Sequence, residues 1–120
     1  MKKLLAVLAV LAFAAPAAVA ATKASVKVSP ATVKAGKTVR VYGSVGTGCA
    51  KGDAVTLYSK AFKGSKHEFA GIPAVFAKQD KHHNFSIHVA IEKTVKKGSY
   101  TIGGRCGGGN LGSAATLKVS

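Results

Sequence analysis

Gly98-Ser99-Tyr100-Thr101-Ile102-Gly103-Gly104-Arg105-Cys106 is the stretch that decides the fold, because it joins an alternating strand pattern to a cysteine. The chain has two cysteines, so Cys49 is the one possible partner of Cys106. On the chain-entropy model, a disulfide that closes this loop of about 58 residues stabilises a fold by about 4 kcal/mol. The sequence therefore predicts a buried strand that ends in a disulfide and a tight loop.

Outward from this stretch, apolar residues alternate with polar ones through most of the chain, a pattern typical of half-buried strands. The clearest example is residues 85–91, and a similar pattern marks about seven short strands in all. They are expected near residues 25–29, 38–45, 54–59, 74–78, 85–91, 99–106 and 114–119. Because no amphipathic helix interrupts them, the sequence predicts an all-β fold, an antiparallel β-sandwich of immunoglobulin-like (Ig-like) type.

Tyr100 gives a further clue to the arrangement of this sandwich. Antibody domains place a Trp beside the disulfide and a corner Tyr two residues before the second cysteine. Here the chain has no Trp, and Tyr100 precedes Cys106 by six residues. We therefore expect Tyr100 at a corner where its strand begins, and the disulfide at the opposite end of the sandwich.

Four segments carry a resemblance to a known group of proteins. They are Val26-Lys27-Val28-Ser29-Pro30, Ala35-Gly36-Lys37-Thr38-Val39, Gly98-Ser99-Tyr100-Thr101-Ile102 and the run from Gly104 to Gly112. Together they resemble short secreted Ig-like proteins of actinobacteria, over nearly the whole chain after its leader. The resemblance implies an Ig-like fold and an extracytoplasmic location, and no activity, since those proteins are mostly uncharacterised. The opening strands are also similar to neocarzinostatin-type carriers, but those are acidic and have two disulfides.

Residues 1–20 have the layout of a secretory signal peptide. Two lysines precede an apolar run from Leu4 to Ala15, and the segment ends in Ala18-Val19-Ala20. The apolar run is shorter than the ~20 residues that span a bilayer. We expect cleavage after Ala20, no membrane span afterwards, and a single Ig-like domain over residues 21–120 that is secreted or loosely associated with the cell envelope.

Charge is the strongest compositional signal. The chain has 18 Lys and Arg residues and four acidic residues, and residues 21–120 keep a formal net charge of +12. Such an excess favours anionic partners such as phosphate-rich wall polymers, acidic lipids, nucleic acid or acidic polysaccharide, although it also serves solubility. Specific nucleic-acid binding is not expected, because three scattered tyrosines provide no stacking platform.

Residues 60–76 are the main candidate for a binding segment, because their pattern is irregular and carries both charge and apolar side chains. The candidate binding residues there are Lys60, Lys63, Lys66, Phe69, Ile72 and Phe76. The three apolar residues, Phe69, Ile72 and Phe76, either form an apolar patch on the surface for a partner or cap the open edge of the sandwich.

The glycine run Gly107–Gly112 matches the phosphate-binding pattern GxGxxG, but that motif joins a strand to a helix. Here a strand pattern follows, so we interpret the run as a flexible hairpin. Arg105 remains a candidate ligand-binding residue, with the glycine amides forming an anion-binding nest beside it.

No catalytic or metal site is predicted, and no cofactor is expected. The four histidines, at positions 67, 82, 83 and 88, lack regular ligand spacing and have lysines nearby. Glu68 adjoins His67, but no nucleophile is placed beside them and both cysteines are assigned to the disulfide.

These features together indicate a secreted, cationic, non-enzymatic Ig-like module. Its expected partner is an anionic wall polymer or another secreted or surface protein. A secreted effector, such as an antimicrobial, a toxin or an inhibitor, and a small-molecule or metal carrier are the alternatives. The sequence leaves the ligand and the oligomeric state open.

Overall fold

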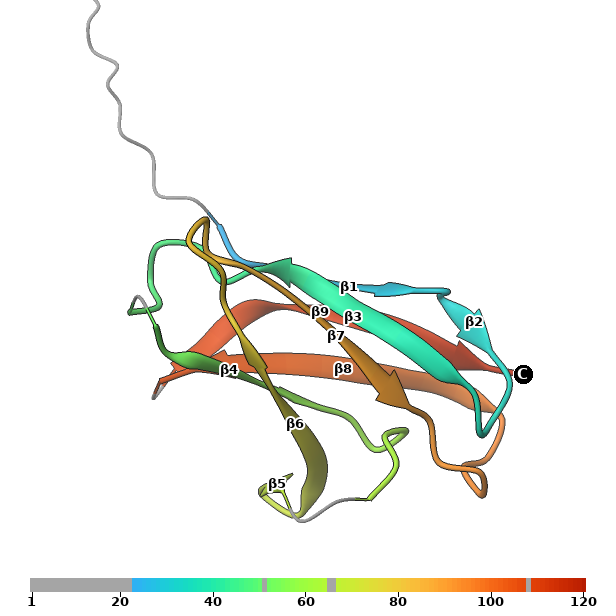
Figure 1. Ribbon diagram of the computed structural model, residues 1–120. Helices are drawn as coiled ribbons and strands as arrows, with labels where there is room; N and C mark the ends of the chain where they lie inside the picture. Colours follow the sequence, from blue (N-terminus) through green and yellow to red (C-terminus); the bar gives the residue numbers. More distant parts are fainter. Residues whose placement is uncertain (1–22, 51, 65–66, 108) are drawn as a thin grey trace, which may run out of the picture.

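The fold is a two-layer β-sandwich, seen in a computed structural model that describes residues 23–50, 52–64, 67–107 and 109–120 (Figure 1). The predicted signal peptide and Lys66 lie outside these residues. Nine strands and no helix occur in the described ranges. None of these residues forms a helix that could cross a membrane.

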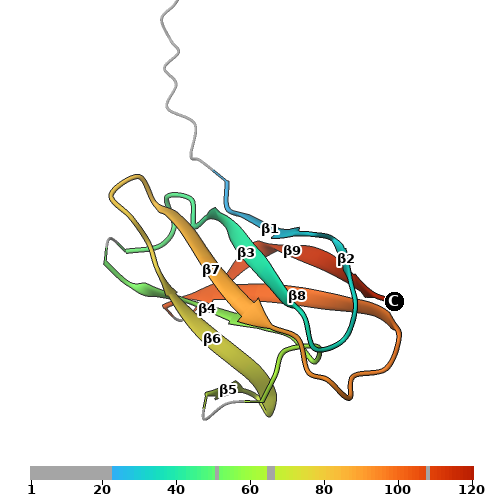
Figure 2. The ribbon, with the colours of Figure 1, turned by 45° about the vertical axis from the view of Figure 1, so that its right-hand side comes forward.

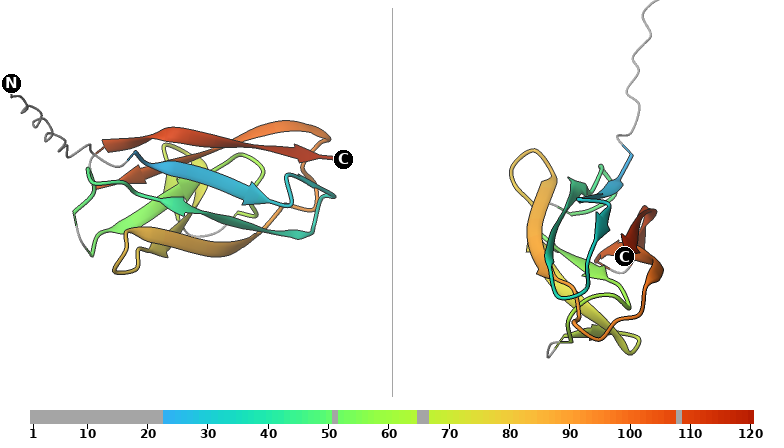
Figure 3. Two further views of the ribbon diagram at one scale, coloured as in Figure 1. Left: turned by 90° about the horizontal axis from the view of Figure 1, so that it is seen from above. Right: turned by 90° about the vertical axis from the view of Figure 1, so that its right-hand side faces the viewer.

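The smaller layer is a three-stranded sheet in the order β1-β3-β7. Its strands are β1 (Ser25–Ser29), β3 (Thr38–Ser44) and β7 (Asn84–Ala90). The larger layer is a six-stranded sheet in the order β2-β9-β8-β4-β6-β5. Its strands are β2 (Thr32–Val33), β4 (Ala54–Tyr58), β5 (Glu68–Phe69), β6 (Ile72–Lys78), β8 (Gly98–Cys106) and β9 (Gly109–Val119). The views along and across the sandwich separate the two layers (Figure 3). This arrangement confirms the predicted Ig-like sandwich.

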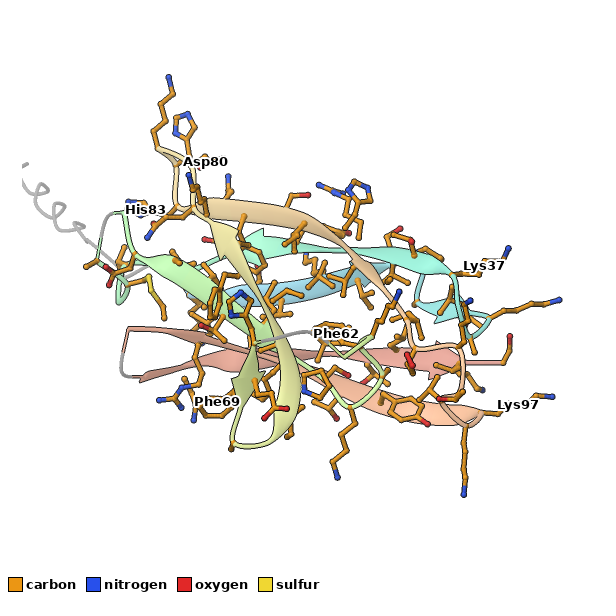
Figure 4. All side chains as sticks on the ribbon, turned by 60° about the horizontal axis from the view of Figure 1, so that its bottom comes forward. Lys37, Phe62, Phe69, Asp80, His83 and Lys97 are labelled. Carbon is orange, nitrogen blue, oxygen red and sulfur yellow. A yellow bond between two sulfur atoms is a disulfide. The ribbon has the colours of Figure 1, made fainter. Side chains whose placement is uncertain are left out.

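The core lies between the sheets and follows the predicted alternation. Val41, Leu57, Ile102 and Leu117 are each fully buried and come from strands of both layers. Phe62, from the segment after β4, is the largest of the fully buried side chains and lies in the middle of the sandwich in Figure 4. The apolar face of each strand therefore packs inward, as its period-two pattern predicts.

The N-terminal part of the described chain contributes a strand to each sheet. β1 pairs antiparallel with β3 up to Ser29, and Pro30, which has no N–H, ends this pairing. The chain then crosses to the other layer, where β2 pairs parallel with the end of β9. The sandwich is otherwise antiparallel, as predicted, and this pair is parallel because Pro30 redirects the chain beside the last strand.

The strand count also differs from the prediction, because β2 and β5 are two-residue strands too short for a period to mark them. A larger difference concerns the glycine run. β9 begins at Gly109, and its residues Asn110 and Gly109 pair with the end of β8. β8 and β9 are therefore the two strands of the predicted hairpin, and Gly109 and Gly112 belong to its second strand rather than to the loop that connects the strands.

The two ends of the sandwich are fixed as predicted. At one end, the Tyr100 hydroxyl donates a hydrogen bond to the Lys96 carbonyl oxygen four residues upstream, the geometry of a tyrosine corner. At the other end, Cys49 and Cys106 form the disulfide, which joins the loop after β3 to the end of β8.

Candidate functional site

The predicted binding residues gather only in part. Phe69 and Ile72 belong to the β5–β6 hairpin, which Figure 2 shows at the lower edge of the sandwich. Phe69 meets Arg105, whose guanidinium carbon lies 4.7 Å from the centre of the ring. Phe76 lies elsewhere on β6, half exposed, and packs on the ring of His67 at 4.5 Å between ring centres.

Of the remaining predicted lysines, Lys60 lines a groove together with Ile72. Lys60 and Lys63 are exposed in the segment between β4 and β5. The backbone N–H of Lys63 donates to the Ala90 carbonyl oxygen, so this segment is tied to the end of β7. Lys66 lies outside the described residues.

Tyr58 is a central residue of this surface that the sequence did not single out. It lies on the outer face of the six-stranded sheet, directly over Gly103 on the neighbouring strand. A Cβ atom at Gly103 would lie 2.6 Å from the Tyr58 ring. The ring therefore rests against backbone, and Phe69 packs on it with 4.8 Å between ring centres. A glycine inside a strand often marks such a close approach, and this signal could have found the site.

A groove of about 660 Å³ lies beside Tyr58 on this face, and we call it the β8–β9 groove. Its lining includes Tyr58, Ile72, Thr101, Gly103, Gly112 and Ala114. Glycine and alanine leave its floor almost without side chains, whereas Tyr58 and Ile72 provide taller apolar groups. The volume lies within the range of about 300–1,000 Å³ that small-molecule sites occupy.

A bulge in β9 accompanies the groove. Gly103 pairs with Ala114, but the next outward-facing residue of β8, Arg105, pairs with Asn110. Between these two pairs, β9 has more residues than β8. The extra residues of β9 therefore bend away from the strand ladder, as β-bulges do. Asn110, Gly112 and Ser113 of this region line the groove.

Contacts on both sides hold the bulge in place. The Leu111 side chain turns toward the core over Gly104, where a Cβ atom would come within 2.7 Å of a Leu111 methyl carbon. The Ser113 hydroxyl oxygen accepts a hydrogen bond from the Val26 N–H at 3.1 Å. The Arg105 guanidinium donates to the Asn110 side-chain oxygen at 2.7 Å. The groove is therefore a fixed feature of the sheet.

A second surface is defined by charge, and we call it the lysine end. Its six exposed lysines come from the β2–β3 turn, the β7–β8 loop and the end of β9: Lys34, Lys37, Lys93, Lys96, Lys97 and Lys118. Backbone hydrogen bonds join the first two segments, from Gly36 N–H to the Ile91 carbonyl oxygen and from Ile91 N–H to the Lys37 carbonyl oxygen. Figure 4 shows Lys37 and Lys97 extending from the same end of the sandwich.

The lysine end contains little negative charge. Across residues 31–37, 91–99 and 116–120, Glu92 is the single acidic residue. Among the described residues, no ion pair engages any of the six lysines. Their charges are therefore directed to solvent, where a polyanion would meet several of them together.

The histidine-containing turn lies at the opposite end. Asp80 accepts hydrogen bonds from the backbone N–H groups of Asn84, at 3.0 Å, and His82, at 2.7 Å. These two bonds, and to a lesser degree the charges of His82 and His83, hold the pKa of Asp80 below its ordinary value of 3.8. Asp80 therefore acts as a cap for this turn, and Figure 4 shows it near His83.

Gln79 connects this turn to the disulfide loop. Its amide nitrogen donates to the carbonyl oxygens of Ala50, at 2.7 Å, and Asp53, at 3.0 Å. Its side-chain oxygen lies 3.1 Å from Nδ1 of His83. These bonds hold His83 in the turn. His88 lies apart from it, on the outer face of the three-stranded sheet.

One group of potential metal-ligating side chains occurs among the described residues, formed by Cys49, Asp53 and Cys106. Its two sulfur atoms are bonded to each other in the disulfide, so neither is a free thiolate. Thiolates are the form in which cysteine binds metals. The group therefore offers the Asp53 carboxylate alone.

Comparison with known proteins supports the fold but identifies no family. No protein-family model and no curated protein sequence matches the chain. Among solved structures, it is similar to the Yersinia pseudotuberculosis adhesin InvE, with 15% identity, a TM-score of 0.59 and coverage of 80% of this chain and 26% of that one. It is also similar to the Pseudomonas fluorescens alkylpurine DNA glycosylase AlkC bound to DNA containing an abasic site analogue. That match has 15% identity, a TM-score of 0.54 and coverage of 82% and 30%. The chain thus spans roughly a third or less of these structures, and the likeness establishes the sandwich fold alone.

Proposed function

We propose that this protein is a secreted, non-enzymatic Ig-like module that binds an anionic polymer of the cell envelope through its lysine end. The observation that carries the proposal is the convergence of six exposed lysines from three segments, with Glu92 as the single acid in those segments. A regular array of phosphates or carboxylates would engage several of these lysines together.

The chemistry of lysine suits such a partner. Each ammonium is a strongly hydrated point charge on a flexible stem, so it follows an irregular array of anions without a fixed geometry. One exposed ion pair contributes little, about 0–1 kcal/mol. Affinity would therefore come from several lysines acting together, and it would fall with salt, because the Debye length is about 10 Å at 0.1 M.

Export is part of the proposal and has separate support. The leader at residues 1–20 has the layout of a signal peptide. The disulfide between Cys49 and Cys106 is compatible with an oxidising compartment. The resemblance to secreted actinobacterial Ig-like proteins points in the same direction.

A retention experiment tests the binding surface. The oxidised protein is applied to purified cell-wall material and eluted with a salt gradient, alongside two triple variants of equal charge change. Lys37→Gln, Lys93→Gln and Lys97→Gln remove charge from the lysine end. Lys23→Gln, Lys78→Gln and Lys81→Gln are the control, because these exposed lysines lie just before β1, at the end of β6 and in the Asp80 turn, away from the lysine end.

We expect the lysine-end variant to elute at clearly lower salt than the control variant and the unchanged protein. Equal losses in the two variants would mean that net charge alone matters and would overturn the assignment of the surface. Failure of the unchanged protein to bind at low salt, or retention that is independent of salt, would overturn the function.

A further inference from the structure

We propose that the β8–β9 groove binds a sugar unit of an acidic saccharide chain, while the acidic groups of neighbouring units contact the lysine end. This inference rests on the proposed function and specifies its ligand. It assigns a recognition role to Tyr58.

The groove is preformed. Tyr58 is fixed from two sides, because it lies against the backbone at Gly103 and packs on Phe69. The bulge is held because Leu111 packs over Gly104 and the Ser113 hydroxyl accepts a hydrogen bond from the Val26 N–H of β1. A ligand entering the groove would therefore order few side chains, and this ordering is a major cost of binding.

Apolar and neutral polar groups together line the groove. Tyr58 and Ile72 present apolar surface, and the neutral polar groups of Ser99, Thr101 and Asn110 also line it. A sugar ring has the complementary pattern, with C–H groups on its faces and hydroxyls around its edge. A lipid chain would cover the Ser99 and Thr101 hydroxyls without giving them hydrogen-bond partners, and buried polar groups without partners carry a free-energy cost.

The charge around the groove and its position suit an acidic chain. Among the described residues, none that lines the groove is acidic, and Lys60 is one of the lining residues. Ser99, at one end of the groove, pairs across the sheet with Lys118, and both are exposed. The groove therefore opens beside the lysine end. A chain that lay in the groove and continued past Ser99 would bring its next anionic groups to these lysines.

The experiment is a titration of 15N-labelled protein followed by amide chemical shifts, with three probes. The first is a short oligogalacturonate, in which each sugar carries a carboxylate. The second is the same oligomer with its carboxylates methyl-esterified, which keeps the sugar rings and removes the charge. The third is polyphosphate, a polyanion without sugar.

We expect oligogalacturonate to shift the amides of Thr101, Gly103 and Ala114, in addition to those of the lysine end. The esterified oligomer should shift the same groove amides with a weaker affinity, and polyphosphate should shift the lysine end alone. Polyphosphate binding without any groove response to oligogalacturonate would overturn the groove assignment and leave the proposed function standing. No binding of either polyanion would overturn both.

Substitutions separate recognition from folding. Tyr58→Leu removes the ring and keeps apolar bulk, and we expect oligogalacturonate affinity to fall by about tenfold, with polyphosphate affinity unchanged. Tyr42→Leu is the matched control, because Tyr42 is a half-buried tyrosine on the outer face of the other sheet. Ala114→Leu fills the floor from an exposed position and gives a second variant should Tyr58→Leu fail to fold. Equal affinity of all three variants for oligogalacturonate would refute the site.

Discussion

Gly43 on β3 gives the sharpest test of how the smaller sheet is built. Its φ angle is +154°, and a Cβ atom at this position would lie 2.0 Å from the Ser25 carbonyl oxygen on β1. The obstructing atom belongs to the backbone, so no side-chain rotation can relieve the clash. Gly43→Ala therefore forces β1 away from β3 or forces Gly43 out of its backbone conformation.

The size of the effect follows from these two terms. Overpacking typically costs about 1–3 kcal/mol, and a non-glycine residue in a glycine-only backbone region costs about 1–3 kcal/mol. β1 cannot shift freely, because it pairs with β3 over its whole length and its Val26 N–H donates to Ser113. We expect a loss of about 4 kcal/mol in the free energy of unfolding, out of a total of about 5–15 kcal/mol. For a domain of this size, the melting temperature would fall by about 16–32 °C.

Urea unfolding of the oxidised protein, followed by far-UV circular dichroism, measures this loss. Gly48→Ala is the matched control, because nothing lies within 4 Å of a Cβ atom there and Gly48 is exposed. Its effect should stay within about 0.5 kcal/mol. If Gly43→Ala were as mild as Gly48→Ala, the close approach of β1 to β3 would be refuted.

Three further predictions concern the ends of the sandwich. Replacing Cys49 and Cys106 by serine should lower the free energy of unfolding by about 4 kcal/mol, measured in urea; intact-mass detection of two free thiols in the native protein would contradict the bond. Tyr100→Phe removes the hydrogen bond to the Lys96 carbonyl and should cost about 1 kcal/mol in the same assay, and an unchanged midpoint would refute the corner. The Asp80 carboxylate has a lowered pKa, so its stabilising effect is present above 3.8 and is lost as pH falls below that value. The stability difference between the native protein and Asp80→Asn should therefore shrink below about pH 4, and a difference that grows there would contradict the cap.

The sandwich and its two fixed ends were predictable because they depend on local signals. The period-two pattern places Leu57 and Ile102 in the core whatever their partners are. The position of Tyr100 six residues before Cys106 separates the corner from the disulfide. Neither inference needs the register between strands.

The groove was not predictable, because it depends on register. Tyr58 and Gly103 are distant in the sequence, and only the pairing of β4 with β8 places the ring over the glycine. The bulge likewise follows from Leu111 packing over Gly104, a contact that no periodicity marks. The predicted binding residues Phe69 and Arg105 do meet, but Phe76 packs on His67 instead.

The lysine end lies between these cases. Its lysines are spread from Lys34 to Lys118, and the charge excess alone does not say that they converge. Most of these lysines lie in the β2–β3 turn and the β7–β8 loop. The strands that precede these two connections run in the same direction, because β1 and β7 are both antiparallel to β3 and β2 continues the path of β1. Strand direction could therefore have predicted the cluster, once the number of strands was known.

The parallel pairing of β2 with β9 has a mechanical consequence. The start of β1 and the end of β9 lie at opposite ends of the sandwich (Figure 1), so tension between these two points pulls β2 and β9 in opposite directions along their length. The bonds from Lys118 N–H to the Ala31 carbonyl oxygen and from Ser120 N–H to the Val33 carbonyl oxygen would then be loaded together, in shear. Such a pair resists extension until its bonds fail as a group, whereas a hairpin peeled from its open end loses them one at a time.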